Sequence, residues 1–174
     1  MRRGQFEVRP GQYPQGFMGV FGQYARAVDY LYRAIEQTSF SADHCSYPLL
    51  YLMRHALEVG LKANIQCMIQ EGQNASGQQM ANTHDLSKLH RKFVALVVEQ
   101  GRMDDDTLAY FRAECMCMES LIRLMPSASS FRYTEDQNGA KVFDAQVLDI
   151  ASMKPMFARA HAILSYTPVV LFGP

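Results

Sequence analysis

The sequence predicts an all-α protein, an up-down helical bundle of about five helices with a small β-hairpin inserted before the last helix. Five stretches carry apolar residues at steps of three and four, the period of a helix with one buried face. The connection 38–45 between the first two stretches is short, as is typical of antiparallel neighbours. A later segment carries an Asn138-Gly139 turn signal between apolar residues, which predicts a hairpin over 131–143. We expect one domain over 18–174, preceded by an extended or flexible N-terminal arm over 1–17.

The composition of the chain limits the classes of function that it can have. A chain of 174 residues with 48% hydrophobic and 20% charged residues is typical of one globular domain. Its 17 basic and 17 acidic residues cancel, so no overall field draws it to nucleic acid or to an anionic membrane. No run reaches the roughly 18 apolar residues that a membrane span needs, and no apolar segment follows the basic N-terminus as in a signal peptide. We therefore expect a cytoplasmic protein without membrane contact.

The stretch 47–71 predicts the central helix of the bundle. Ser46 suits an N-cap, Pro48 suits a first turn where its missing N–H costs nothing, and Glu71-Gly72 is a stop signal. The apolar face is wide, which indicates neighbours on several sides, and it is built on Leu50, Met53, Leu57, Leu61, Ile65 and Met68.

Charged residues stand inside this apolar arc. Arg54 falls at about the azimuth of Leu61 and Ile65, where a guanidinium must be paired or must face a polar cavity. Glu58 and Lys62 follow at steps of one turn, so the spacing predicts a ladder of three charges. Two interpretations stay open, a salt-bridge ladder at the edge of the core and a polar binding pocket anchored by Arg54.

The remaining helices are predicted from their apolar period and caps. The first should cover 19–37, and the polar segment 72–83 should be a surface loop, either functional or merely disordered. Thr83 or Asp85 should cap a helix over 85–100 that ends at Gly101. Three acidic residues, 104–106, should open a helix that runs to Met125. The last helix should start at Asp149 or, preferably, at Ser152, and should run to about residue 166.

Taken together, three pieces of the chain resemble the HEPN superfamily of small helical bundles. They are the segment RHALEVGLKA with Arg54, Glu58 and Lys62, the sequence His84-Asp85-Leu86 that opens the next helix, and Phe131-Arg132-Tyr133. The resemblance covers roughly 47–166. HEPN proteins include metal-independent ribonucleases of toxin–antitoxin and phage-defence systems as well as catalytically inactive nucleotide-binding or RNA-binding modules, and many are homodimers. The resemblance implies no metal and no cofactor.

The nuclease signature of this family is an arginine followed, after four to six residues, by a histidine on a late helix. No arginine of this chain satisfies it, and the nearest match is Lys154 with His161. Lysine lacks the planar fork that arginine offers a phosphate. His161 could still act as a general acid or base, with Lys154 or Arg159 steadying the phosphate.

Three functional hypotheses follow. The first is a non-catalytic HEPN-like module that binds a nucleotide, an RNA phosphate or a partner protein through Arg54, Lys62 and Arg132, with Glu58 and His84 beside them. The second is a divergent metal-independent ribonuclease that acts as a dimer, so the sequence leaves enzymatic activity undecided. The third is a structural oligomerisation domain, suggested by 11 methionines that no chemistry explains.

Overall fold

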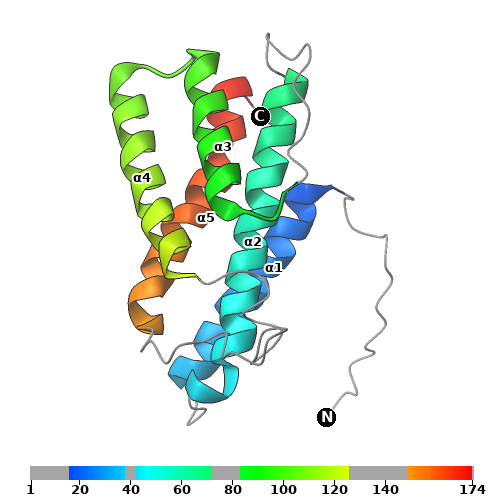
Figure 1. Ribbon diagram of the computed structural model, residues 1–174, viewed down its shortest axis with the longest axis vertical. Helices are drawn as coiled ribbons and strands as arrows, with labels where there is room; N and C mark the ends of the chain where they lie inside the picture. The colour runs from blue at the N-terminus through cyan, green and yellow to red at the C-terminus, as the bar shows by residue number, and fades with distance from the viewer. Residues whose placement is uncertain (1–15, 38–41, 72–82, 126–148, 174) are drawn as a thin grey trace, which may run out of the picture.

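The computed structural model describes residues 16–37, 42–71, 83–125 and 149–173. Within these ranges the chain forms five helices, α1 to α5, and no strand (Figure 1). The all-α class predicted from the sequence is confirmed for this part of the chain. The predicted hairpin over 131–143, residue Arg132 and positions 1–15 of the expected arm lie outside the described residues.

The helices pack in a ring that is crossed by one central contact. Each helix touches the next, α5 touches α1, and α2 also touches α5 through the middle. Figure 1 shows α4 and α5 running in opposite directions. None of these helices is both long enough and apolar enough to cross a membrane. Their bounds are α1 Phe17–Gln37, α2 Ala42–Glu71, α3 Leu86–Gln100, α4 Asp105–Leu124 and α5 Ile150–Phe172.

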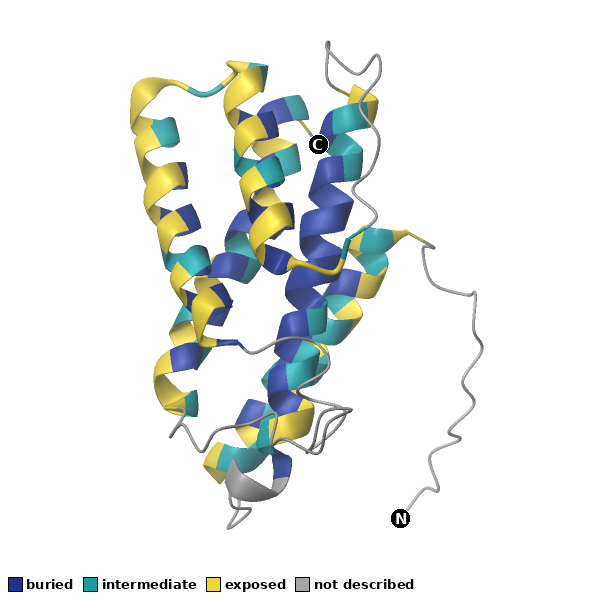
Figure 2. Cartoon of the chain, viewed as in Figure 1, coloured by how far each residue is buried: buried dark blue, intermediate teal, exposed yellow. Residues whose placement is uncertain are grey.

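The helix α2 is the central element, as the sequence predicts. Every residue from Ala56 to Ile65 is buried, so this helix has neighbours on all sides over almost three turns (Figure 2). Its predicted start is wrong, however. The helix begins at Ala42, which places Ser46 inside it rather than at its cap. The buried Cys45 and Leu49 extend the apolar stripe backwards, and Pro48 lies inside the helix, near the end of its second turn, rather than in its first turn.

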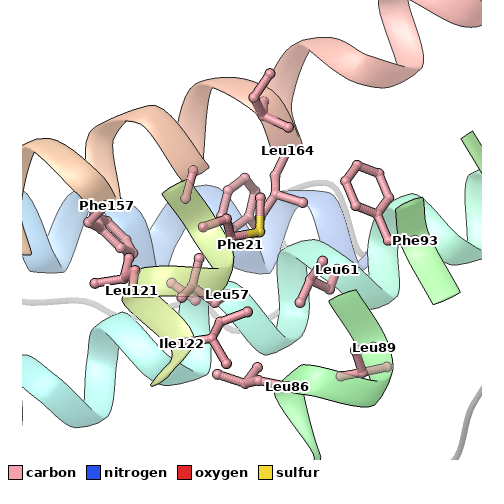
Figure 3. Close-up of a cluster of buried hydrophobic side chains, with 14 of the residues drawn as sticks. Phe21, Leu57, Leu61, Leu86, Leu89, Phe93, Leu121, Ile122, Phe157 and Leu164 are labelled. Atoms are coloured by element: carbon pink, nitrogen blue, oxygen red, sulfur yellow. The ribbon is translucent and has the colours of Figure 1, made fainter. Parts of the chain in front are cut away.

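One junction brings α1, α2 and α5 into close contact. A Cβ at Gly60 would lie 2.9 Å from the ring of Phe21 and 3.0 Å from the side chain of Leu164, so a glycine leaves the room that these two side chains fill against α2. One turn further along α2, the fully buried Asn64 donates its amide Nδ2 to the carbonyl of Gly60 at 2.9 Å and to that of Leu164 at 2.8 Å. Figure 3 shows Phe21 and Leu164 within the core, together with Leu57 and Leu61.

The last helix differs from its prediction at both ends. Asp149 is the N-cap and accepts a hydrogen bond from the backbone N–H of Ser152 at 3.2 Å, so the preferred cap at Ser152 is wrong. Pro168 lies inside α5, which continues to Phe172. Proline leaves the carbonyl four residues earlier without its helical donor. That carbonyl belongs to Leu164, and Asn64 supplies the missing donor, which is why the helix tolerates the proline.

The helices α3 and α4 follow their predictions closely. Asp85 caps α3 by accepting from the backbone N–H of Lys88 at 3.1 Å, and Gly101 ends it in the left-handed conformation with φ of 60°. Asp104 caps α4 by accepting from the backbone N–H of Thr107 at 2.7 Å. Local caps therefore decide both boundaries between these two helices.

Candidate functional site

The predicted charges of α2 come together with the start of α3. Arg54 donates from Nη2 to the backbone carbonyl of His84 at 3.0 Å. Glu58 Oε1 lies 2.8 Å from Lys62 Nζ and 2.8 Å from His84 Nδ1. These four residues, called here the α2 ladder, are grouped as the sequence predicts, whereas Arg132 lies outside the described residues.

Three of the four residues of the α2 ladder are buried, whereas the side chain of His84 is 76% exposed. Arg54, Glu58 and Lys62 are 8%, 6% and 9% exposed. Burial would raise the pKa of Glu58, but the hydrogen bonds from Lys62 and His84 outweigh it, so this pKa lies below its ordinary value. Burial lowers the pKa of Arg54 despite the nearby carboxylates of Glu58 and Asp85. The α2 ladder thus fixes His84 at the beginning of α3, and a phosphate would have to compete with Glu58 for Lys62.

A cavity opens elsewhere, between α1 and α5. Its volume is about 320 Å³, and we call it the α1–α5 cavity. Its lining combines basic, acidic and aromatic side chains with small apolar ones. From α1 it is lined by Ala25, Arg26, Val28, Asp29 and Tyr32, and from α5 by Lys154, Phe157, Ala158 and His161.

His161 and Lys154 line this cavity from the same helix. The ring of His161 lies against that of Phe21, with the centroids 5.1 Å apart, and burial lowers the pKa of the imidazole. The imidazole is therefore neutral at neutral pH. Lys154 Nζ lies 2.6 Å from Glu36 Oε1 and 5.6 Å from the centroid of the Tyr32 ring. Two residues that the sequence pairs as a degraded catalytic motif thus line the same cavity.

Tyr32 lines the cavity where α1 meets the start of α5. Its hydroxyl donates to the backbone carbonyl of Ile150 at 3.0 Å. Burial, followed by the nearby charges of Asp149 and Glu36, raises its pKa well above the ordinary value. The phenol therefore stays protonated and acts as a fixed donor that holds α5 against α1.

Arg159 is separate from this cavity. It makes a two-pronged contact with Glu114 on α4, from Nε to Oε2 at 2.8 Å and from Nη2 to Oε1 at 2.8 Å. These hydrogen bonds lower the pKa of Glu114 and raise that of Arg159. The structure therefore divides the predicted catalytic trio, because Lys154 and His161 meet at the cavity while Arg159 turns to the opposite flank of α5.

Sequence reasoning missed the contribution of α1. Arg26 and Asp29 line the cavity, yet the sequence shows them only as polar residues off the apolar stripe of their helix. No local signal identifies them, because their role depends on which face of α5 packs opposite. Asn64 was also missed, although an amide on a helix that is apolar on all sides is itself a signal of a buried hydrogen bond.

Within the described residues, no group of three or more histidine, cysteine, aspartate or glutamate side chains is placed to hold a metal ion. Comparisons with protein-family models, with curated proteins and with solved structures found no match for this chain.

Proposed function

We propose that this chain is a non-catalytic HEPN-like helical module that binds the phosphate group of a nucleotide or of RNA in the α1–α5 cavity. The observation that carries the proposal is the meeting of Lys154, His161 and Arg26 around one cavity of about 320 Å³. That volume lies near the lower end of the roughly 300–1,000 Å³ of small-molecule sites. It suits a phosphate with part of its nucleoside rather than a duplex.

The donors at the cavity support an anionic ligand. Lys154 has three N–H donors, and Glu36 accepts from Nζ at 2.6 Å, so others can reach a ligand oxygen. Asp29 is paired with Arg33 at 2.8 Å, which reduces its repulsion of an incoming phosphate. A neutral His161 offers one further donor and one acceptor.

The α2 ladder suits a supporting role better than a binding one. Its cations, Arg54 and Lys62, are buried and already bonded to His84 and Glu58. Recruiting Lys62 for a ligand would take its ammonium from the buried Glu58 carboxylate, which costs several kcal/mol for a buried charge, on the order of 3–5. We therefore move the proposed contact from the α2 ladder to the α1–α5 cavity.

Binding can be measured by fluorescence anisotropy with labelled single-stranded RNA and by calorimetry with mononucleotides. Lys154→Ala and Arg26→Ala should each weaken binding, and each should reduce the slope of log affinity against log salt by about one for RNA if the side chain contacts a phosphate. Lys88→Ala is a matched control, because Lys88 is an exposed lysine on α3 that lies 3.8 Å from Asp85. Unchanged affinity in both cavity variants would refute the proposal.

A divergent metal-independent ribonuclease is the second candidate. The observation that favours it is that His161 and Lys154 line the same cavity, where an imidazole can accept a proton while an ammonium holds the phosphate. Pure protein should then cleave RNA in the presence of a chelator, and His161→Ala should abolish the cleavage while leaving RNA binding measurable. No cleavage after long incubation at high protein concentration would remove this candidate. A neighbouring antitoxin gene would support a toxin–antitoxin context, which the resemblance alone suggests.

A further inference from the structure

His84 presents an imidazole to solvent immediately before α3. Its side chain is 76% exposed, and it alone is exposed among the histidines whose side chains the structure describes. The others, His55, His90 and His161, are half-buried or buried. A reagent in solution therefore reaches His84 more freely than any of these three.

The two ring nitrogens of His84 are not equivalent. Nδ1 lies 2.8 Å from Oε1 of Glu58, and the same oxygen accepts from Lys62 Nζ at 2.8 Å. The hydrogen bonds from Lys62 and His84 hold the pKa of Glu58 below its ordinary value, so at neutral pH this carboxylate is ionised and can only accept. Nδ1 must therefore carry the proton of the bond, and in the neutral imidazole the lone pair is on Nε2.

The position of this ring is fixed by both its side chain and its backbone. Arg54 Nη2 donates to the carbonyl of His84 at 3.0 Å, and the next residue, Asp85, caps α3. Because Nδ1 faces Glu58 on α2, Nε2 on the other side of the ring is directed away from that helix. An exposed nitrogen with a lone pair, on a ring held by a carboxylate, is the arrangement of an activated nucleophile.

The charges near His84 suit an anionic electrophile. Lys62 matches Glu58 at 2.8 Å within α2. Lys88 Nζ lies 3.8 Å from Oδ2 of Asp85. Both carboxylates thus have a cation nearby, which reduces their repulsion of a second anion. Attack by Nε2 also leaves a positive charge on the imidazole, and Glu58 stabilises it through Nδ1, as the buried carboxylate of a hydrolytic triad stabilises its imidazolium.

We propose that His84 Nε2 accepts a phosphoryl group from an activated donor, an acyl phosphate or a phosphoramidate. The Nε2 lone pair forms a new P–N bond as the bond between phosphorus and the leaving group breaks. The electron pair of the broken bond departs with the carboxylate of the acyl phosphate or with the ammonia of the protonated phosphoramidate. The proton on Nδ1 stays in its hydrogen bond to Glu58, so the transfer needs no further reactant.

This acceptor site is separate from the α1–α5 cavity, which is lined from α1 and α5. In the proposed transfer His84 is the group that reacts, whereas Glu58 and Lys62 are positioning residues that act through it. The buried pair on α2 fixes the tautomer of the imidazole and keeps a negative charge behind it. The chemistry at His84 and the binding at the cavity can therefore be tested independently.

The rate of phosphorylation tests the proposal. The full chain is incubated at neutral pH with acetyl phosphate in one arm and with potassium phosphoramidate in the other. N-acetylhistidinamide is added to both arms as an exposed imidazole without a carboxylate. ³¹P NMR follows the products, and mass spectrometry of digests kept alkaline locates the phosphoryl group. In at least one arm, which identifies the donor, His84 should react roughly ten-fold or more faster than the free imidazole, because a buried carboxylate contributes orders of magnitude to the reactivity of a histidine.

Removal of the buried pair should abolish this advantage. Glu58→Leu combined with Lys62→Met removes both charges together, and the rate at His84 should fall to that of N-acetylhistidinamide. Glu119→Gln is the matched control, because this carboxylate on α4 bonds Arg123 at 2.7 Å, and the variant should react as the wild type does. Long-range ¹H–¹⁵N NMR gives a readout that a merely structural role would not move. The proton should be on Nδ1 of His84 in the wild type and should be shared between the two nitrogens in the double variant.

Circular dichroism separates loss of reactivity in the double variant from loss of fold, and the comparison of the wild type with the free imidazole needs no variant. A His84 that reacts no faster than N-acetylhistidinamide in both arms would overturn the proposal. So would a phosphoryl group on Nδ1 or chiefly on another histidine. A folded double variant that keeps the wild-type rate would overturn it as well.

Discussion

Removal of the Asn64 amide should expose how α5 tolerates Pro168. In the wild type, Asn64 Nδ2 is the donor for the Leu164 carbonyl that the proline leaves without its helical N–H. Asn64→Ala therefore leaves a buried acceptor without a donor. The other carbonyl that Asn64 bonds, that of Gly60, keeps the backbone N–H four residues on, so its loss matters less.

The expected magnitude follows from one orphaned acceptor. A buried carbonyl without its donor costs about 1–3 kcal/mol. Asn64 Oδ1 itself has no donor within the described residues, so the substitution also removes one unsatisfied buried acceptor and offsets part of the destabilisation. We expect Asn64→Ala to lower the free energy of unfolding by about 2 kcal/mol, including the small cavity that it leaves.

A second substitution tests the reason for this loss. Pro168→Ala restores a backbone N–H at the position that normally bonds the Leu164 carbonyl. In that background Asn64→Ala should cost about 1 kcal/mol less, because the helix now supplies the donor itself. The cavity term is the same in both backgrounds and cancels from the comparison.

Urea unfolding of the four proteins, followed by far-UV circular dichroism, measures this coupling. Equal slopes against urea are the control that the unfolding transition stays comparable between variants. If the two substitutions are additive to within about 0.5 kcal/mol, Asn64 does not compensate for Pro168 and the reasoning is refuted.

Three further predictions concern the free energy of unfolding, each measured by chemical denaturation. Gly60→Ala should lower it by about 1–3 kcal/mol, because the new Cβ would lie 2.9 Å from a phenyl ring of α1. Gly22→Ala is the control: its nearest neighbouring atom lies at 3.9 Å, so this variant should raise the free energy of unfolding by up to about 1 kcal/mol. Equal effects of the two substitutions would contradict the close contact at Gly60. Glu58→Leu should lower the free energy of unfolding by about 3–5 kcal/mol, because it leaves the Lys62 ammonium buried without its carboxylate. Adding Lys62→Met should restore most of this stability. A loss of stability that persists in the double variant would show another cause. Burial lowers the pKa of His90 below its ordinary value of 6.5, so the unfolded chain binds the proton first. The contribution of His90 to stability should be fully present above about pH 6.5 and should decline as the pH falls toward the lower pKa of the folded state. His90→Phe should flatten this decline in the free energy of unfolding. An unchanged slope of stability against pH between about pH 8 and about pH 5 would exclude His90 as its source.

Features that depend on neighbouring residues in sequence could be predicted. The boundaries of α3 and α4 follow from Asp85, Gly101 and Asp104, whose side chains or backbone conformations act within one turn. The grouping of Glu58 with Lys62 could be predicted for the same reason, because residues four apart on a helix are neighbours.

Features that depend on how the helices are rotated against each other could not. The continuation of α5 through Pro168 rests on an amide from α2, and no local pattern near the proline contains it. The same limit explains why the contact between Arg159 and α4 could not be predicted. Its spacing from His161 is visible in the sequence, but its bond to Glu114 requires knowledge of which side of α5 faces α4.

The Asn64 bond also bears on the order in which the bundle folds. Asn64 and Leu164 are 100 positions apart, so this contact closes a long loop, whereas contacts between successive helices close shorter ones. Until α5 arrives, one donor of Asn64 has only water as a partner, and the middle of α2 cannot become dry. The longest helix, which packs against α1, α3 and α5, therefore completes its burial only when the last helix of the chain is in place.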